Sequence, residues 1–134
     1  MFKIPQSIAD EMVAHCLQGL PDEACGLFAG TSEANEVAVL YPTQNLAHSA
    51  MIYTVDPLAH LKADRDAEKN GFVITGVFHS HTHTEAYPSP TDVAQAPDPS
   101  WHYVIVSLRD RSPSIRSYRI VDQVITEESV EITT

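Results

Sequence analysis

The chain has 134 residues, and its 18 acidic and 8 basic side chains give a formal net charge of −10. This length predicts one domain, residues 1–134, and the acidic balance argues against a nucleic-acid partner, because phosphate binding needs clusters of Lys and Arg. No apolar run approaches the ~20 residues that would cross a bilayer, and the N-terminus lacks the apolar segment of a signal peptide. We therefore expect a cytoplasmic protein without a membrane partner.

A helix, two strands and a second helix are predicted in the first half of the chain, over residues 4–20, 23–30, 35–41 and 56–70. The first helix should end where Gly19 and Pro21 follow its apolar positions, and the second should begin where Asp56 can cap it. The composition TSEAN between the two strands is typical of a turn.

The second half is predicted to hold a buried strand and three later strands, over residues 71–78, 102–108, 114–120 and 124–132. The first of these, GFVITGVF, is apolar and β-branched, which is typical of a buried strand. A long polar loop over residues 80–88 follows it, and loops beside chemistry commonly bind substrate. Because helices alternate with strands, we expect an α/β (α+β) domain with a mixed β-sheet flanked by helices.

Four polar residues follow the buried strand in the pattern H-x-H-x7-S-x2-D: His79, His81, Ser89 and Asp92. Side chains at i and i+2 of a strand point to one face, so the two imidazoles can reach one ion. Ser89 and Pro90 are typical of a helix start, which would aim the carboxylate of Asp92 back at the strand end. Two His nitrogens and a carboxylate oxygen match the three protein ligands of a catalytic zinc with an open fourth position. The pattern therefore predicts one Zn²⁺ per chain.

Simpler roles compete with these assignments. Two histidines in a loop are often solvated or paired with carboxylates, and Glu23 by itself is an ordinary acid at a strand start. Cys25 would share a strand face with Glu23 and is an alternative nucleophile beside a histidine, although a small buried hydrophobe is the commoner role of a free Cys. His83 shares strand parity with His81 and is a further candidate ligand, but we favour a substrate-loop or solvent role for it.

The segments EACG (residues 23–26) and HSH (79–81), followed by Ser89 and Asp92, resemble the motif of the JAMM (MPN+) metalloprotease family in residue type, spacing and order. The resemblance extends along essentially the whole chain and implies a single JAMM/MPN-type domain. The chain departs from many members at Thr82, where they have Pro, and it carries one histidine that the motif does not require.

The resemblance also assigns roles to individual residues. It implies that His79, His81 and Asp92 bind zinc. It further implies that Glu23 acts as the general base and that Ser89 helps to stabilise the oxyanion. The phrases PDEACG, FHSHTHTEAYPSPTD, HYVIVSLRD and RSYRIVD are similar to one bacterial branch of the family, whose members release cysteine from the C-terminus of a ubiquitin-like sulfur-carrier protein.

The expected function is therefore that of a zinc metallopeptidase. It would hydrolyse the amide bond after the C-terminal Gly-Gly of a ubiquitin-like sulfur carrier and release cysteine, a step of cysteine biosynthesis. One alternative is a broader isopeptidase that cleaves ubiquitin-like conjugates, and another is a non-catalytic MPN interaction scaffold. A zinc deaminase would need H-x-E and P-C-x-x-C elements, and other zinc proteases would need HExxH; the sequence contains none of these.

Overall fold

The computed structural model describes residues 1–33 and 35–134. Within them the helices are α1 (Gln6–Gly19), α2 (Pro57–Lys69) and α3 (Pro90–Ala94). The strands are β1 (Phe2–Pro5), β2 (Cys25–Gly30), β3 (Val39–Thr43), β4 (Val73–His81), β5 (His102–Ser107), β6 (Ser114–Val121), β7 (Val124–Glu128) and β8 (Val130–Thr133).

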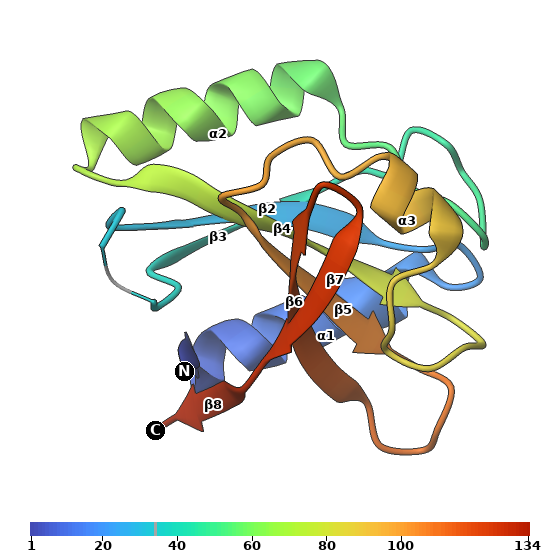
Figure 1. Ribbon diagram of the computed structural model, residues 1–134. Helices are drawn as coiled ribbons and strands as arrows, with labels where there is room; N and C mark the ends of the chain where they lie inside the picture. The colour runs from blue at the N-terminus through green and yellow to red at the C-terminus, as the bar shows by residue number, and fades with distance from the viewer. Residues whose placement is uncertain (34) are drawn as a thin grey trace.

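Six strands form one sheet in the order β3-β2-β4-β5-β6-β7 (Figure 1). β4 and β5 are parallel, and the other neighbouring strands are antiparallel. Because two parallel strands end at the same edge of a sheet, the segments that follow β4 and β5 start from the same edge. The mixed sheet with helices on it confirms the predicted α/β (α+β) fold class.

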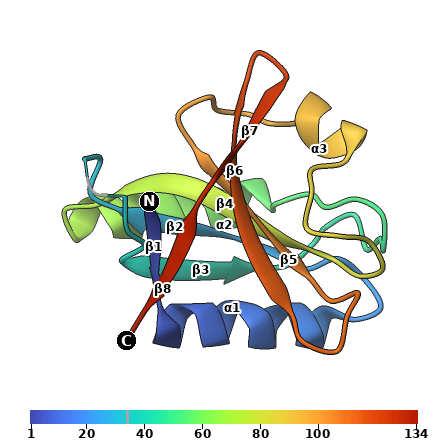
Figure 2. The same ribbon diagram turned by 60° about the horizontal axis from the view of Figure 1, so that its bottom comes forward.

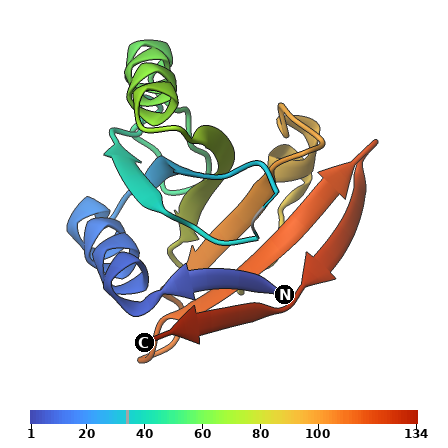
Figure 3. The same cartoon turned by 90° about the vertical axis from the view of Figure 1, so that its left-hand side faces the viewer.

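The helices α1 and α2 cover opposite faces of the sheet (Figures 1 and 3). Phe78 of β4 belongs to the buried apolar cluster beneath α1, whereas Val77 belongs to a second cluster with Ala63 of α2. Successive side chains of a strand point to opposite faces, so His79 and His81 share the face of Val77. The two histidines therefore lie on the α2 side of the sheet.

The two ends of the described chain pair with each other. β1 and β8 form a separate two-stranded parallel sheet (Figure 2), in which Phe2 lies opposite Val130. Phe2 and Ile4 are buried while Lys3 is exposed, which is the alternation of a strand. The predicted helix 4–20 therefore begins later, at Gln6.

The predicted strand over residues 124–132 is two strands, β7 and β8. Its first part pairs with β6 at the edge of the main sheet, and its second part pairs with β1. The backbone N–H of Phe2 donates to the carbonyl of Ser129, the residue at the break, at 2.9 Å. No periodicity in the sequence marks this change of partner, because both parts alternate in the same way.

The remaining elements follow the predictions with shifted ends. The buried strand extends through His81, so both histidines lie on it. Asp56 caps α2 by accepting the N–H of Leu58 at 2.9 Å. The strand predicted over 35–41 is β3, which begins only at Val39, and the predicted turn includes residue 34, which lies outside the described residues.

No helix in the described ranges is long and apolar enough to span a membrane.

Candidate metal centre

His79 and His81 lie at the end of β4, and Asp92 lies in the first turn of α3. Asp92 Oδ2 is 3.2 Å from His79 Nε2 and 3.0 Å from His81 Nε2. All three residues are buried, and each offers a ligand atom within 4.8 Å of the other two. Among residues 1–33 and 35–134, no other three His, Cys, Asp or Glu side chains meet in this way. The structure thus brings together the three residues that the sequence predicts as ligands.

The start of α3 fixes the direction of the Asp92 carboxylate. Ser89 is the N-cap, and its Oγ accepts the backbone N–H of Asp92 at 3.1 Å. In return, Asp92 Oδ2 accepts the backbone N–H of Ser89 at 2.9 Å. This reciprocal pair is a capping box, and it holds the carboxylate toward the end of β4. Ser89, which the sequence predicts as the N-cap, therefore also positions the proposed ligand Asp92.

Burial and hydrogen bonding have opposite effects on the pKa values of these three residues. Burial lowers the pKa of His79. Burial acts to raise the pKa of Asp92, but hydrogen bonds from the two histidines outweigh it and hold that pKa well below its usual range. Burial acts to lower the pKa of His81, but hydrogen bonds to Asp92 and to the carbonyl of Glu85 outweigh it and raise that pKa. The ionised carboxylate gives the site a negative charge that favours a cation.

Glu23 lies beside this group. The antiparallel ladder of β2 and β4 pairs Cys25 with His79, which places Glu23 level with His81. Glu23 is only 5% exposed, and its Oε1 has no hydrogen-bond partner within the described residues. Burial raises the pKa of Glu23 to about 8, although nearby His81 acts to lower it. A buried carboxyl with a pKa near neutrality is suited to accept and release a proton.

The two imidazoles are held in place by neighbours outside the motif. His81 Nδ1 lies 2.9 Å from the carbonyl of Glu85. Because a carbonyl only accepts, Nδ1 carries a proton, so Nε2, which lies beside Asp92, is the nitrogen that would bind a metal after losing its own proton. The ring of Tyr53 stacks on His79 with centroids 4.3 Å apart. Sequence reasoning missed Tyr53, because a contact between distant segments leaves no local signal.

The backbone around Glu23 has its own supports. The N–H of Ala24 donates to Ser80 Oγ at 2.8 Å. Asn45 Nδ2 donates to the carbonyl of Glu23 at 2.9 Å and to that of Ile52 at 3.0 Å. The buried Asn45 therefore links the segment just before β2 to the segment that carries Tyr53, a clamp that the sequence analysis also missed. The only signal was the polar, turn-rich composition around it.

The donor set fits zinc. Zinc in proteins takes imidazole nitrogens and carboxylate oxygens, and three protein ligands are the number found in catalytic sites. The histidine nitrogens that face Asp92 are not used by any other group in the described residues. The second ring nitrogen of His81, Nδ1, donates to a backbone carbonyl, which is the usual outer contact of a metal-binding histidine. Glu23, whose Oε1 has no hydrogen-bond partner among the described residues, interacts electrostatically with His81 and Asp92 but does not belong to the ligand group.

The alternative residues lie elsewhere. His83 is exposed, makes a 2.8 Å hydrogen bond with Thr82 Oγ1, and does not belong to the ligand group. Cys25 Sγ lies 3.5 Å from Thr43 Oγ1, and burial raises its pKa. Burial also raises the pKa of Cys16 to about 12. Because the thiolate is the nucleophile, neither cysteine suits nucleophilic catalysis.

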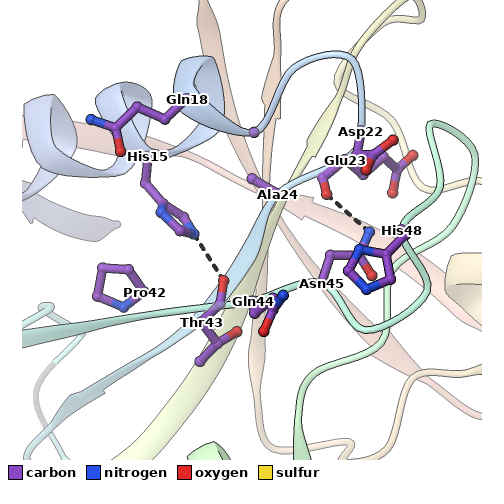
Figure 4. A pocket seen from close by; sticks show the side chains of 11 residues that line it. His15, Gln18, Asp22, Glu23, Ala24, Pro42, Thr43, Gln44, Asn45 and His48 are labelled. Carbon is purple, nitrogen blue, oxygen red and sulfur yellow. Dashed lines mark hydrogen bonds between the residues drawn. The ribbon is translucent and has the colours of Figure 1, made fainter.

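A polar cavity of about 510 Å³ approaches Glu23 from the side of α1. Figure 4 shows its walls, which include His15, Asp22 and His48. His15 Nε2 lies 3.0 Å from the carbonyls of both Cys25 and Thr43. That nitrogen therefore donates its proton to the backbone of β2 and β3. His15 supports the sheet and does not contact the histidines of β4.

Comparisons with known proteins identify the family. A family profile described as prokaryotic homologues of the JAB domain matches residues 5–121. The CysO-cysteine peptidase of Mycobacterium tuberculosis is 43% identical over 130 residues, covering 96% of this chain and 89% of the relative. A probable TtuB-protein conjugate cleaving protease of Thermus thermophilus is 37% identical over 94 residues, covering 69% of this chain and 62% of the relative. The chain belongs to the prokaryotic JAB-domain homologues, and it is a JAMM-type hydrolase.

Solved structures agree with this assignment. A protein from Desulfitobacterium hafniense, 38% identical, superposes with a TM-score of 0.91 over 99% of this chain and 93% of its own. A structure titled as a JAMM metalloprotease-like zinc site of the proteasome and signalosome has a TM-score of 0.63 at 18% identity, over 100% of this chain and 99% of its own. At that identity the second likeness concerns the fold alone, and it confirms the JAB/MPN architecture.

Proposed function

We propose that the protein is a zinc-dependent peptidase, in which His79, His81 and Asp92 hold the metal. The observation that carries this proposal is the buried convergence of the three side chains beside Glu23, whose Oε1 has no hydrogen-bond partner among the described residues. We also propose that residues 1–134 act as one JAMM/MPN domain. The cytoplasmic location of the protein stays a prediction.

Zinc bound to such a ligand set supplies a Lewis acid that polarises a carbonyl and makes water nucleophilic at neutral pH. Glu23 removes the proton from the attacking water, whose oxygen bonds to the scissile carbonyl carbon. Glu23 then passes this proton to the leaving nitrogen as the C–N bond breaks. One water is consumed, and a carboxylate and an amine are formed.

Ser89 has the chemistry for a second role. Its Oγ already accepts the N–H of Asp92, so its own hydroxyl hydrogen is available to another acceptor. We propose that this hydrogen is donated to the carbonyl oxygen as negative charge develops there. A positioned donor of this kind typically contributes about 10²–10³-fold to turnover.

The substrate we propose is a ubiquitin-like sulfur-carrier protein whose C-terminal Gly-Gly is joined to cysteine, with release of free cysteine. The support is the likeness to the Mycobacterium tuberculosis CysO-cysteine peptidase over nearly the whole chain. An extended glycine-rich tail is the kind of segment that a protein can bind through backbone hydrogen bonds as an added strand.

The second candidate is a broader protease that cleaves ubiquitin-like conjugates. The specific observation in its favour is the likeness to the probable TtuB-protein conjugate cleaving protease of Thermus thermophilus. A non-catalytic scaffold is disfavoured, because all three proposed ligands and Glu23 are present and buried.

The test is a mass-spectrometric assay of the zinc-loaded protein with two substrates. One is a ubiquitin-like carrier whose Gly-Gly is extended by one cysteine, and the other is the same carrier in isopeptide linkage to a protein lysine. We expect the first to lose one cysteine residue. Glu23→Gln is expected to slow this reaction by about 10²–10⁴-fold, because it removes only proton transfer. Cleavage of the isopeptide conjugate alone would replace the cysteine assignment with the broader one.

A further inference from the structure

The loop between β4 and α3 connects two of the proposed metal ligands, His81 and Asp92. The side chains of residues 83–85 and of Tyr87 in this loop are exposed. These residues therefore gain little support from burial of their own side chains, and the position of the loop depends on hydrogen bonds to its backbone.

Side chains from two other strands hold the backbone carbonyls on either side of Glu85. The carbonyl of Thr84 accepts a hydrogen bond from Ser107 Oγ of β5 at 2.6 Å. The carbonyl of Ala86 accepts a hydrogen bond from the hydroxyl of Tyr118 of β6. Because β4, β5 and β6 are neighbours in the sheet, the loop is fastened across the sheet rather than only to the strand that it leaves.

The peptide unit that joins Ala86 to Tyr87 extends the tyrosine contact toward the metal centre. Its carbonyl is the one that Tyr118 binds, and its N–H donates to the carbonyl of Glu85 at 2.8 Å. The same Glu85 carbonyl lies 2.9 Å from His81 Nδ1. Because a peptide unit is planar, a contact that fixes its C=O also fixes the direction of its N–H. A run of hydrogen bonds therefore connects the Tyr118 hydroxyl to the His81 ring.

Tyr118 is a rigid anchor for this run. Its side chain is fully buried in the apolar cluster that includes Val77, on the side of the sheet where the two histidines lie. The ring of Tyr87 meets it edge-on, with centroids 5.6 Å apart. A side chain in a close-packed interior has little freedom to move, so the hydroxyl of Tyr118 is a fixed point for the loop.

We infer that Tyr118 is a positioning residue for the metal, and that it acts by holding the Glu85 carbonyl where that carbonyl orients the His81 ring. The inference rests on the proposed function, because it concerns the same metal centre. Ligands that are already in place bind more tightly than ligands that the metal must order. Outer contacts of a metal-binding histidine typically account for about 10–100-fold in affinity.

Tyr103 provides a matched control. It lies opposite Tyr118 in the β5–β6 ladder and belongs to the same buried cluster. Its hydroxyl also donates to a backbone carbonyl, that of Asp98, at 2.6 Å. Asp98 follows α3 and lies outside the loop that joins the ligands. Tyr103→Phe thus removes the same kind of bond on the same face of the sheet without touching the connection to His81.

The experiment measures the zinc affinity of the wild type, Tyr118→Phe and Tyr103→Phe by competition with a chromogenic chelator. Tyr118→Phe is expected to bind zinc about 10-fold more weakly, at the lower end of the range for outer contacts, because it acts on His81 through an intervening peptide unit. Tyr103→Phe should keep the wild-type affinity. The visible absorption of Co²⁺ bound in place of zinc reports ligand geometry, and it should change only in Tyr118→Phe.

Urea unfolding of the metal-free proteins separates positioning from stability. Both variants lose a hydrogen bond from a buried tyrosine, so both are expected to be less stable than the wild type. A role in stability alone would leave the zinc affinity and the Co²⁺ spectrum of the folded protein unchanged.

Hydrogen exchange tests the connection in the metal-free wild type, without a substitution. The side chain of Tyr87 is exposed, but its amide should exchange slowly because it donates to the Glu85 carbonyl. This protection should be lost in Tyr118→Phe and kept in Tyr103→Phe. A freely exchanging Tyr87 amide in the wild type would overturn the inference, even where Tyr118→Phe does not fold.

The outcomes separate the inference from the proposed function. A wild type that binds zinc, with the same affinity in Tyr118→Phe or with an equal loss in Tyr103→Phe, would overturn the positioning role and leave the proposed function intact. A wild type that binds no zinc would overturn the proposed function, and the positioning role with it.

Discussion

At the scale of single residues, Glu23 is the position where structure adds most to the sequence. By sequence it is one of 18 acidic residues and opens a predicted strand. In the structure it is buried, level with His81, and one of its oxygens is without a partner among the described residues. Burying a carboxyl without a hydrogen bond is costly, and such positions are usually retained for chemistry. Its burial therefore supports the role of proton carrier.

The raised pKa of Glu23 predicts how the stability of the metal-free protein depends on pH. The folded-state pKa of about 8 exceeds the ordinary value of 4.5, so folding favours the protonated form. The contribution of Glu23 to the free energy of unfolding is therefore fully present below about pH 4.5 and is lost as the pH rises through about 8. Glu23→Gln cannot ionise. Its free energy of unfolding relative to wild type should therefore rise from pH 5 to 9 in urea titrations of chelator-treated protein.

Glu11→Gln, on the exposed side of α1, makes the same change in charge and serves as the control for this series. A constant difference between Glu23→Gln and wild type across that pH range would contradict the burial of an unpartnered carboxyl.

At the scale of elements, the short helix α3 determines where one proposed ligand points. It has only five residues, so its direction depends on its N-terminal cap more than on its own length. Ser89 and Asp92 bond to each other's backbone, which couples the cap to the metal centre. The serine of the motif consequently has a structural role beside the proposed catalytic one.

The coupling predicts that Ser89→Ala weakens zinc binding. Loss of the Oγ acceptor leaves the N–H of Asp92 without its cap and loosens the carboxylate, and outer-shell changes of this kind typically cost about 10–100-fold in metal affinity. Ser89→Thr keeps a capping hydroxyl and should keep the affinity. Competition with a chromogenic chelator measures both. An unchanged zinc affinity in Ser89→Ala would restrict this residue to the oxyanion role.

The sequence predicted the elements that have a local pattern and missed those that depend on distant partners. The H-x-H spacing, the buried strand before it and the Ser89 cap are local features, and each is present in the structure. The pairing of β1 with β8 joins the two ends of the described chain, and the stacking of Tyr53 on His79 joins segments far apart. Periodicity carries no information on such contacts. The same reasoning explains why Asn45 was not recognised as a clamp on Glu23.

At the scale of the whole molecule, the two ends of the sheet are held in different ways. At the end away from the histidines of β4, His102 Nδ1 lies 2.5 Å from Glu128 Oε1, which also accepts the Ser117 hydroxyl at 2.7 Å. Phe2 of β1 stacks on His102 with centroids 4.0 Å apart. This group, buried except for the half-buried Glu128, joins β1, β5, β6 and β7 through side chains of the protein alone. At the other end, Asp92 joins α3 to His79 and His81 of β4, and a bound metal would strengthen this link.

Zinc is therefore expected to contribute to the stability of the whole fold. A ligand that binds only the native state stabilises it by about 2.7 kcal/mol at a free concentration of 100 times its Kd, which for a chain of this length raises the Tm by roughly 10 °C. Calorimetry should show this rise when zinc is added to chelator-treated wild type and to Glu23→Gln, because Glu23 is not among the proposed ligands. Asp92→Ala should show none, because it loses the residue that bridges α3 and the two histidines. An equal rise in Asp92→Ala would place the zinc on other residues and would remove the physical basis for the proposed hydrolysis at this site.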